Sequence, residues 1–129
     1  MQRLYALKQI SKNSVKKEGL EAYIEEERRI LQKIEFPFIV GFVKAFSDDK
    51  NVYFLMEYIK GVELFSVIRE LPCLNKPIAR YFFASLMLSV EHLHSNSIIY
   101  RDIKPENSVV DHTGKVYLID MGTAKFLKK

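Results

Sequence analysis

The chain has 129 residues, of which 48% are hydrophobic and 28% charged, an ordinary mixture for a single globular domain. Its 20 Lys and Arg exceed its 16 Asp and Glu by four, and no basic face interleaved with aromatic residues accompanies this excess, so nucleic acid is not an expected partner. A single Cys73 excludes an internal disulfide, and no apolar stretch is long enough for a signal peptide or a membrane span, so we expect a cytoplasmic protein without membrane insertion.

The first half of the chain predicts a sheet with one helix. Residues 3–10 (RLYALKQI) have strand character. A helix is predicted over residues 19–34, and Pro37 in the following EFPF disfavours its continuation. Two apolar runs, 39–46 and 51–59, are joined by the polar SDDK and therefore predict a hairpin.

The second half of the chain predicts helices followed by a small hairpin. Residues 61–71 are typical of a short helix, and residues 75–95 of a long one. The long helix is apolar on nearly all sides, which predicts a buried position within a helical layer. Residues 108–110 and 116–120 flank the turn DHTGK and predict a second hairpin. The sequence thus predicts an α+β fold with a sheet-rich N-terminal part and a helix-rich C-terminal part.

One acidic residue lies where the helix over residues 19–34 should be apolar. Apolar residues from Leu20 to Ile34 recur on one face, and Glu27 falls in the middle of that face. A buried carboxylate is costly unless a cation meets it, and Lys8 in the first strand is a candidate partner. The alternative is that Glu27 reaches solvent and Lys8 is an exposed strand lysine.

Polar side chains gather at both ends of the second hairpin. Asn107 directly precedes its first strand and Asp120 directly follows its second, so two oxygen ligands should converge. Oxygen ligands without His or Cys suit Mg²⁺ that also binds phosphate oxygens. Asp102 lies on the same loop beside Lys104, and an ionised carboxylate there can accept a proton from an attacking hydroxyl. The alternative, a charged surface loop, does not explain why these residues cluster at both ends of one hairpin.

Three motifs carry a family resemblance. YRDIKPEN (residues 100–107) resembles the catalytic loop of eukaryotic protein kinases, LIDMG (118–122) resembles their metal-binding D-F-G, and YALK (5–8) resembles the strand with their phosphate-binding lysine. The segments ERRILQKIEFPFIV and YFLMEYIKGVELF are similar to the AGC serine/threonine group, most of all to the cyclic-nucleotide-dependent kinases, which depend on cGMP or cAMP.

The resemblance implies a protein-kinase-like bilobal fold, present in part. Residues 1–58 would form a remnant small lobe, with its sheet and αC-type helix, and the hinge; residues 59–129 would form a partial helical large lobe with the catalytic-loop hairpin. The pattern departs from the family in three ways: no Gly-rich loop precedes Lys8, no activation segment or A-P-E follows Gly122, and Met121 replaces the usual Phe. We therefore expect a chain truncated at both ends that is inactive in isolation; the alternative is a non-catalytic interaction module.

The resemblance also assigns the chemistry. Asp102 would be the catalytic base that orients the substrate hydroxyl, and Lys104 would steady the transferring phosphoryl group. Asn107 and Asp120 would bind Mg²⁺.

The implied nucleotide site binds ATP. Lys8 would hold the α- and β-phosphates and pair with Glu27. The remaining implied nucleotide contacts are Ala6, Met56, Glu57, Ile59, Glu63 and Val109.

The resemblance implies a serine/threonine protein kinase that transfers the γ-phosphate of ATP to Ser or Thr of protein substrates. Glu63 and Glu106 would attract basic residues that precede the phosphorylated residue. Arg101 would have a regulatory role by meeting a phosphate on an activation segment. A cyclic-nucleotide-binding regulatory region elsewhere in the parent protein is a further expectation.

Overall fold

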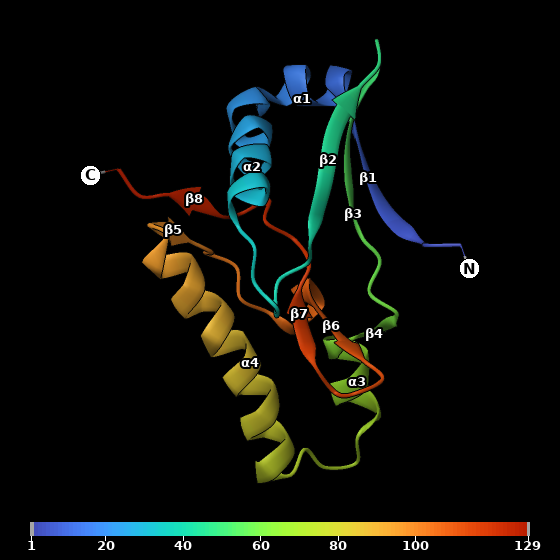
Figure 1. The fold of residues 1–129 in the computed structure, drawn as a ribbon, viewed down its shortest axis with the longest axis vertical. Coiled ribbons are helices and arrows are strands. Elements are labelled where there is room, and N and C mark those ends of the chain that lie inside the picture. The colour runs from blue at the N-terminus through green and yellow to red at the C-terminus, as the bar shows by residue number, and fades with distance from the viewer. Residues whose placement is uncertain (1, 129) are drawn as a thin grey trace.

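The computed structural model describes residues 2–128, and Figure 1 shows its elements. The helices are α1 (Lys12–Glu18), α2 (Glu21–Lys33), α3 (Leu64–Glu70) and α4 (Lys76–Ser95). The strands are β1 (Tyr5–Ser11), β2 (Phe42–Ser47), β3 (Asn51–Glu57), β4 (Gly61–Glu63), β5 (Ile98–Ile99), β6 (Ser108–Asp111), β7 (Val116–Leu118) and β8 (Lys125–Phe126). This is an α+β arrangement, as the sequence predicted.

An antiparallel sheet in the order β1–β3–β2 forms one part of the molecule, with α2 beside it (Figure 1). Phe54 and Met56 alternate with more exposed residues on the central strand β3, as a half-buried strand requires. Phe54 packs into the same apolar cluster as Ile30 and Leu31 of α2, so burial of apolar area fixes the helix against the sheet.

The second part is built around a three-stranded sheet in the order β4–β6–β7, against which α3 and α4 pack (Figure 1). Leu64 of α3, Phe82 of α4, and Val110 and Val116 of the β6–β7 hairpin form its apolar cluster. The large cluster extends into this part through Tyr100, Leu118 and Met121, so its apolar packing joins the two parts of the molecule. The predicted lobe boundary at residue 58 stays a prediction.

Helix α1 was not predicted, because its seven residues include one apolar side chain, Val15, and so show no apolar periodicity. It begins where the Ser11 hydroxyl accepts the Ser14 N–H and ends at Gly19, whose φ of 67° lies in the left-handed region that glycine adopts freely. Both ends of this helix are therefore specified by single residues rather than by apolar periodicity.

Two other predictions need correction. Residues 61–71 were predicted as one helix, but Gly61–Glu63 pairs with β6 as strand β4 before α3 begins. Residues 39–41 precede β2 as a connection, in which Ile39 forms an isolated bridge to Leu118. Tertiary pairing has overridden local preference at both places.

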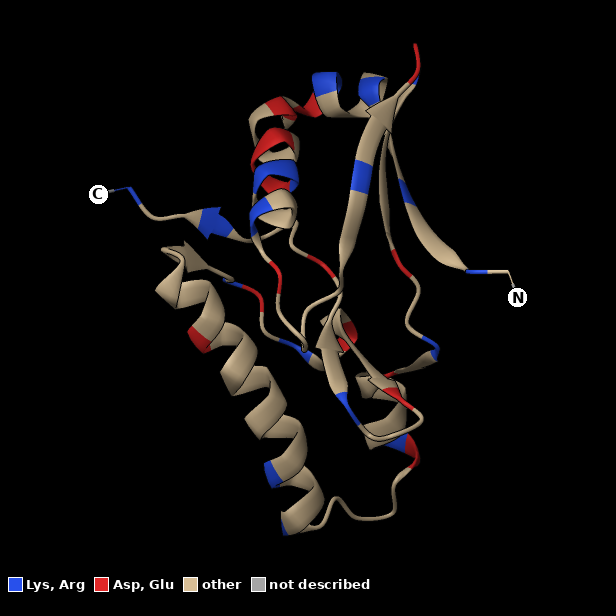
Figure 2. Cartoon of the chain, viewed as in Figure 1, with Lys and Arg blue, Asp and Glu red and all other residues tan. Residues whose placement is uncertain are grey.

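The predicted burial of α4 is correct for one face only. Its buried residues are Phe82, Ser85, Ser89 and Leu93. On its other faces Phe83 is 64% exposed, and Figure 2 shows a helix with few charged residues. The strands β5 and β7 pack on one side of α4, and the apolar cluster that joins its Phe82 to Leu64 brings α3 against the same helix. Within residues 2–128, no helix is long and apolar enough to cross a membrane.

Candidate active site

Lys8 and Glu27 form the predicted ion pair. Lys8 Nζ lies 2.6 Å from Glu27 Oε1, and the Glu27 side chain is only 4% exposed. Burial raises the pKa of Glu27 above its ordinary value, and Lys8 counters this in part. Burial lowers the pKa of Lys8, but attraction to Glu27 and then to Asp120 outweighs it and raises the pKa, so the lysine stays protonated. The alternative of a solvated Glu27 and an unpaired Lys8 was wrong.

Lys8 also reaches the second part of the molecule. Its Nζ lies 3.5 Å from Asp120 Oδ1, and that oxygen accepts the Gly122 N–H at 2.7 Å. A Cβ on Gly122 would lie 3.0 Å from the same oxygen, so the small residue gives the carboxylate room. One ammonium group therefore links β1, α2 and the end of the β6–β7 hairpin.

The loop before β6 is ordered by side chains. Asn107 Nδ2 donates to the Asp102 backbone oxygen at 3.0 Å and to its Oδ2 at 3.2 Å. Lys104 Nζ lies 3.1 Å from Asp102 Oδ2, and this hydrogen bond and charge raise the pKa of Lys104. Pro105–Asn107 forms a 3₁₀ turn, and the Ile119 N–H donates to the Asn107 carbonyl at 3.1 Å. The residue next to Asp120 is thus hydrogen-bonded to Asn107, so the two ends of the hairpin meet as predicted.

The donors in this region fit a hard divalent cation shared with a phosphate. The Asn107 amide nitrogen is committed to Asp102, which leaves its oxygen as an acceptor, and Asp120 adds a half-exposed carboxylate. Mg²⁺ is commonly held by one or two carboxylates together with phosphate oxygens and water. Among residues 2–128, no three His, Cys, Asp or Glu side chains form a metal cluster.

The predicted nucleotide contacts lie around one cavity. Ala6, Met56, Glu57, Ile59 and Val109 all line a space of about 230 Å³ between β1, the end of β3 and β6. Its lining is largely apolar, as expected for a site that takes a flat ring between aliphatic side chains. Glu63 is outside this lining; it is exposed on β4 opposite Val109.

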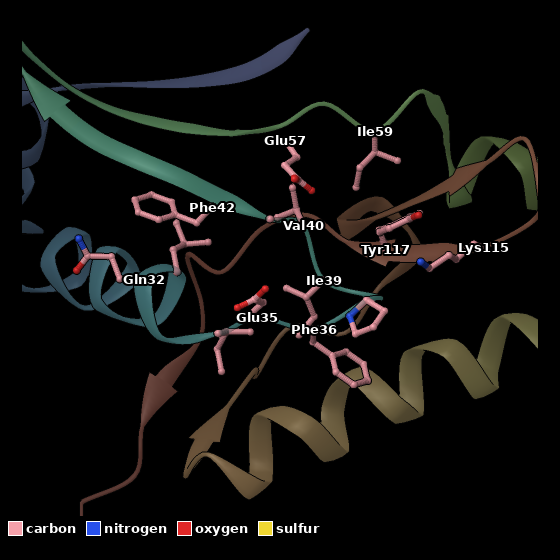
Figure 3. A pocket seen from close by; sticks show the side chains of 14 residues that line it. Gln32, Glu35, Phe36, Ile39, Val40, Phe42, Glu57, Ile59, Lys115 and Tyr117 are labelled. Carbon is pink, nitrogen blue, oxygen red and sulfur yellow. The ribbon is translucent and has the colours of Figure 1, made fainter. Parts of the chain in front are cut away.

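A larger cavity of about 540 Å³ lies on another side of the segment after β3 and was not predicted. Figure 3 shows Glu57 approaching it from β3, and Lys115 and Tyr117 from the β6–β7 hairpin. It lacks Lys8, Asp102, Asn107 and Asp120, so the larger volume does not mark the polar site. Glu57 and Ile59 line both cavities, so the segment after β3 separates one cavity from the other.

Comparison with known proteins agrees with this geometry. The family model described as protein kinase domain matches residues 1–129. The chain belongs to the protein kinase domain family. It is 39% identical over 125 residues to cAMP-dependent protein kinase type 3 of Saccharomyces cerevisiae, covering 97% of this chain and 31% of that protein. It is 44% identical over 121 residues to a cGMP-dependent protein kinase of Plasmodium berghei, covering 94% of this chain and 14% of that protein.

A third relative is the probable serine/threonine protein kinase IRE of Arabidopsis thaliana, 39% identical over 123 residues, covering 95% of this chain and 10% of that protein. The kinase-domain chain therefore spans less than a third of the length of these relatives. The resemblance to cyclic-nucleotide-dependent kinases within the AGC group, inferred from the motifs, is confirmed by these matches.

The remaining predicted residues of the kinase domain lie at the rim of the site. Arg101 has a φ of 72° and its Nε donates to the Thr123 carbonyl at 2.6 Å, so its guanidinium holds the segment that follows Gly122. Glu106 is exposed on the 3₁₀ turn next to Asn107. Glu106 therefore lies on the same loop as Asp102, and Glu63 lies on β4, which contacts the 3₁₀ turn that carries Glu106.

Sequence reasoning missed the buried support of the kinase site. Tyr100 is 2% exposed and Met121 1% exposed, and both belong to the large apolar cluster. Burial, followed by the charges of Asp120 and Asp102, raises the pKa of Tyr100 well above its ordinary value, so the phenol stays neutral. The Thr123 hydroxyl donates to the Tyr100 carbonyl at 2.9 Å. Met121 directly follows Asp120 and Tyr100 lies two residues before Asp102, so an apolar residue close to each of these acids in the sequence was the available signal.

Proposed function

We propose that the protein containing this chain is a serine/threonine protein kinase that transfers the γ-phosphate of ATP to protein substrates. The observation that carries the proposal is the position of Lys8 between Glu27 at 2.6 Å and Asp120 at 3.5 Å. Its relatives include a cAMP-dependent protein kinase, a cGMP-dependent protein kinase and a probable serine/threonine protein kinase. The ammonium group of Lys8 is held between two carboxylates, and Ala6, two residues earlier on the same strand, lines the small apolar cavity, so Lys8 is a suitable partner for the phosphates of a nucleotide bound there.

The polar residues then divide the work of phosphoryl transfer, which consists mostly of positioning and charge neutralisation. Asp102 accepts the proton of the attacking hydroxyl, and Asn107 holds its carboxylate in place through the contact at 3.2 Å. Lys104 Nζ lies 3.1 Å from the same carboxylate. When substrates are bound, its ammonium group can exchange this contact for one with the transferring phosphoryl group. Mg²⁺ bound by Asn107 and Asp120 would neutralise phosphate charge, as in protein kinases generally.

The catalytic assignment is tested in the full-length protein by Asp102→Asn. We expect kcat to fall by about a thousandfold, because the amide cannot accept the proton, while nucleotide affinity changes little. Asp49→Asn, on the exposed β2–β3 turn, is the matched control. Equal loss in both variants, or full activity of Asp102→Asn, would refute the assignment.

The phosphate-binding assignment is tested by Lys8→Met with Lys44→Met as control, since both lysines lie on strands of the same sheet. We expect about a hundredfold loss of kcat/KM for ATP in the first variant and almost none in the second. A normal KM and kcat in Lys8→Met would show that the Lys8–Glu27 pair is only structural.

For the substrate, we propose a preference for basic residues before the phosphorylated Ser or Thr, such as Arg-Arg-x-Ser. Glu106 and Glu63 are both exposed carboxylates, and a guanidinium binds a carboxylate with two parallel hydrogen bonds. In the alternative, Glu63 contacts only the ribose and Glu106 only its own loop. A peptide array that compares the wild type with Glu63→Gln and Glu106→Gln decides between them. The preference should weaken in both variants and at high salt, and an unchanged preference would exclude both glutamates.

A further inference from the structure

Helix α2 has a second engaged face that the proposed chemistry does not use. Glu26, next to Glu27, accepts the backbone N–H of Phe126 on Oε1 at 2.9 Å, across 100 residues of sequence. Glu26, Arg29 and Lys33 share one face of the helix at spacings of three and four residues. This face turns toward the segment that follows Gly122, whereas the face with Glu27 and Ile30 is buried.

The side chain of Phe126 lies between two cations of that face. The Arg29 guanidinium carbon lies 5.3 Å from the ring centroid, and Lys33 Nζ lies 5.3 Å from the same centroid. Both distances are within the range in which a cation is attracted by an aromatic ring. The ring also packs against the large apolar cluster, so it holds α2 by apolar contact as well as by charge.

Phe126 is itself anchored to the rest of the molecule. Strand β8 pairs with β5, placing Phe126 opposite Ile98, and the Leu127 N–H donates to the Ser97 carbonyl at 2.8 Å. Lys33 Nζ reaches the Asn96 carbonyl, at 3.3 Å, in the same region. The partner of α2 is therefore a backbone segment fixed by strand pairing rather than a loose tail.

The same segment runs back to the active site within a few residues. It begins at Asp120, which contacts Lys8, and continues through Thr123, which is held by Tyr100 and Arg101. A closed circuit results: Asp120 contacts Lys8, Lys8 contacts Glu27 on α2, and Glu26 on α2 contacts Phe126 at the other end of the segment. A displacement of Phe126 must move either α2 or the segment that carries Asp120.

We propose that Glu26 and Phe126, with Arg29 and Lys33 beside the ring, form a clamp that positions α2 and thereby keeps Glu27 against Lys8. The inference rests on the proposed kinase function for its effect on turnover, but not for its effect on the ion pair. Phe126 and Glu26 are positioning residues, because they touch neither Lys8 nor Asp120. If the clamp is lost, we expect the amine of Lys8 to become more accessible, although no residue of the active site itself has been changed.

The first test measures the ion pair directly in the full-length protein. Acetic anhydride is used at low excess, and acetylation of Lys8 is followed by mass spectrometry relative to the exposed Lys50 in the same sample. Phe126→Ala should raise the relative rate about tenfold, because Glu27 no longer covers the amine, and should speed amide exchange in residues 21–33. Phe46→Ala is the matched control: Phe46 also has a lysine near its ring, Lys44 at 5.5 Å, but it lies on β2 away from α2.

The hydrogen bond is tested by a conservative pair. Glu26→Gln keeps an oxygen that accepts the Phe126 N–H and should leave Lys8 protected, whereas Glu26→Ala should expose it. Glu25→Ala is the control for charge, since Glu25 is exposed and pairs with Arg28 on the same helix. Unchanged Lys8 acetylation in both Phe126→Ala and Glu26→Ala would overturn the clamp, whatever their activity.

The effect on turnover is tested by a double-mutant cycle. In the wild-type background Phe126→Ala should lower kcat about tenfold with little change in KM for ATP, and Phe126→Tyr should restore it. In a Glu27→Gln background Phe126→Ala should lower kcat by less than about twofold, because the effect of Phe126 on turnover acts through Glu27. Additive losses would overturn the positioning role. If the wild type transfers no phosphate, the proposed function fails, and Lys8 acetylation still decides the clamp.

Discussion

The molecule contains two antiparallel hairpins whose turns are organised by the same device. In β2–β3 the Asp48 carboxylate accepts the N–H groups of Lys50 and Asn51 at 2.8 and 2.7 Å and the Tyr53 hydroxyl at 2.8 Å. In β6–β7 the Asp111 carboxylate accepts the Thr113 and Lys115 N–H groups, the Thr113 hydroxyl, and the Tyr117 hydroxyl at 3.2 Å. An aspartate at the start and a tyrosine hydroxyl on the returning strand define both turns.

The two hairpins differ in what their open ends carry. The β6–β7 hairpin has Asn107 before it and Asp120 after it, and both are polar groups of the proposed active site. The β2–β3 hairpin begins at Phe42 and ends at Glu57, which lines both cavities and pairs with Arg3 rather than with Lys8. The hydrogen bonds of the turn therefore favour formation of a hairpin. The residues at its open end determine whether the hairpin contributes to the active site.

The largest expected effect separates the two hairpins by activity. Asp120→Asn should lower phosphotransfer by on the order of a hundredfold or more, because the neutral amide weakens both cation binding and attraction of Lys8. Asp48→Asn should leave the rate within about twofold. The measurement is kcat/KM on a basic peptide with thermal unfolding as the check on folding. Similar losses in the two variants would show that the hairpins do not differ in this way.

The second prediction compares two glycines beside the hairpins. Gly61 of β4 pairs opposite Asp111, and an added Cβ would lie 2.2 Å from the backbone oxygen of Val110. At Gly41, before β2, the Cβ would lie 2.6 Å from the flexible Glu57 carboxylate, which can move away. We expect Gly61→Ala to lower the free energy of unfolding by about 1–3 kcal/mol and Gly41→Ala by less than about 1 kcal/mol. Denaturant unfolding measures both, and equal losses would contradict the difference.

Most of the fold and the central pair of the site could be predicted because their signals are local. The apolar stripe of α2 with a single carboxylate in it singled out Glu27, the family resemblance selected Lys8 as its partner, and turn residues predicted both hairpins. Asn107 and Asp120 were predicted to converge for the same reason, since hairpin geometry alone brings the ends of two strands together.

The parts that were not predicted depend on contacts between distant segments. Strands β5 and β8 have two residues each, too few for any periodicity, and they form because they pair with each other. The contact of Glu26 with Phe126 spans 100 residues and leaves no pattern in the chain. The exposed faces of α4 were mispredicted. An apolar composition shows that a helix would be stabilised by burial, but it does not show that another helix or strand is there to cover it.

A smaller effect is expected from acid. Hydrogen bonds from the Thr113 hydroxyl, and then from backbone N–H groups and Tyr117, lower the pKa of Asp111 below its ordinary value of 3.8. A group whose pKa is lower in the folded state stabilises that state above its unfolded pKa and loses this contribution as the pH falls through the folded pKa. The stabilisation by Asp111 should thus be complete above about pH 4 and disappear below it.

This prediction is measured as the thermal midpoint of wild type and Asp111→Asn from pH 6 to pH 2. At pH 6 the variant should be less stable by about 1 kcal/mol, and below the folded pKa the two curves should converge. The pKa of Asp48 is lowered as well, by Tyr53 first, so Asp48→Asn should show convergence in the same direction. A constant gap between wild type and variant at all pH values would contradict a role for the ionised carboxylate.

The smallest effect comes from the tyrosine hydroxyls. Tyr117→Phe removes a donor 3.2 Å from Asp111 but keeps the ring, over which Lys115 Nζ lies at 4.8 Å. Because Asp111 retains its bonds to Thr113 and Lys115, the loss should be only about 0.5 kcal/mol. Tyr53→Phe should cost more, since its donor bond to Asp48 is 2.8 Å long and its oxygen also accepts from Asn51 at 3.3 Å. Urea unfolding of the two variants measures the difference.

Neither change should alter phosphotransfer, because each hydroxyl lies at the turn, and Asn107 and Asp120 lie at the opposite end of the β6–β7 hairpin. A loss of activity in Tyr117→Phe alone would mean that the turn and the site of that hairpin are coupled, and that the strands between them do not isolate one end from the other.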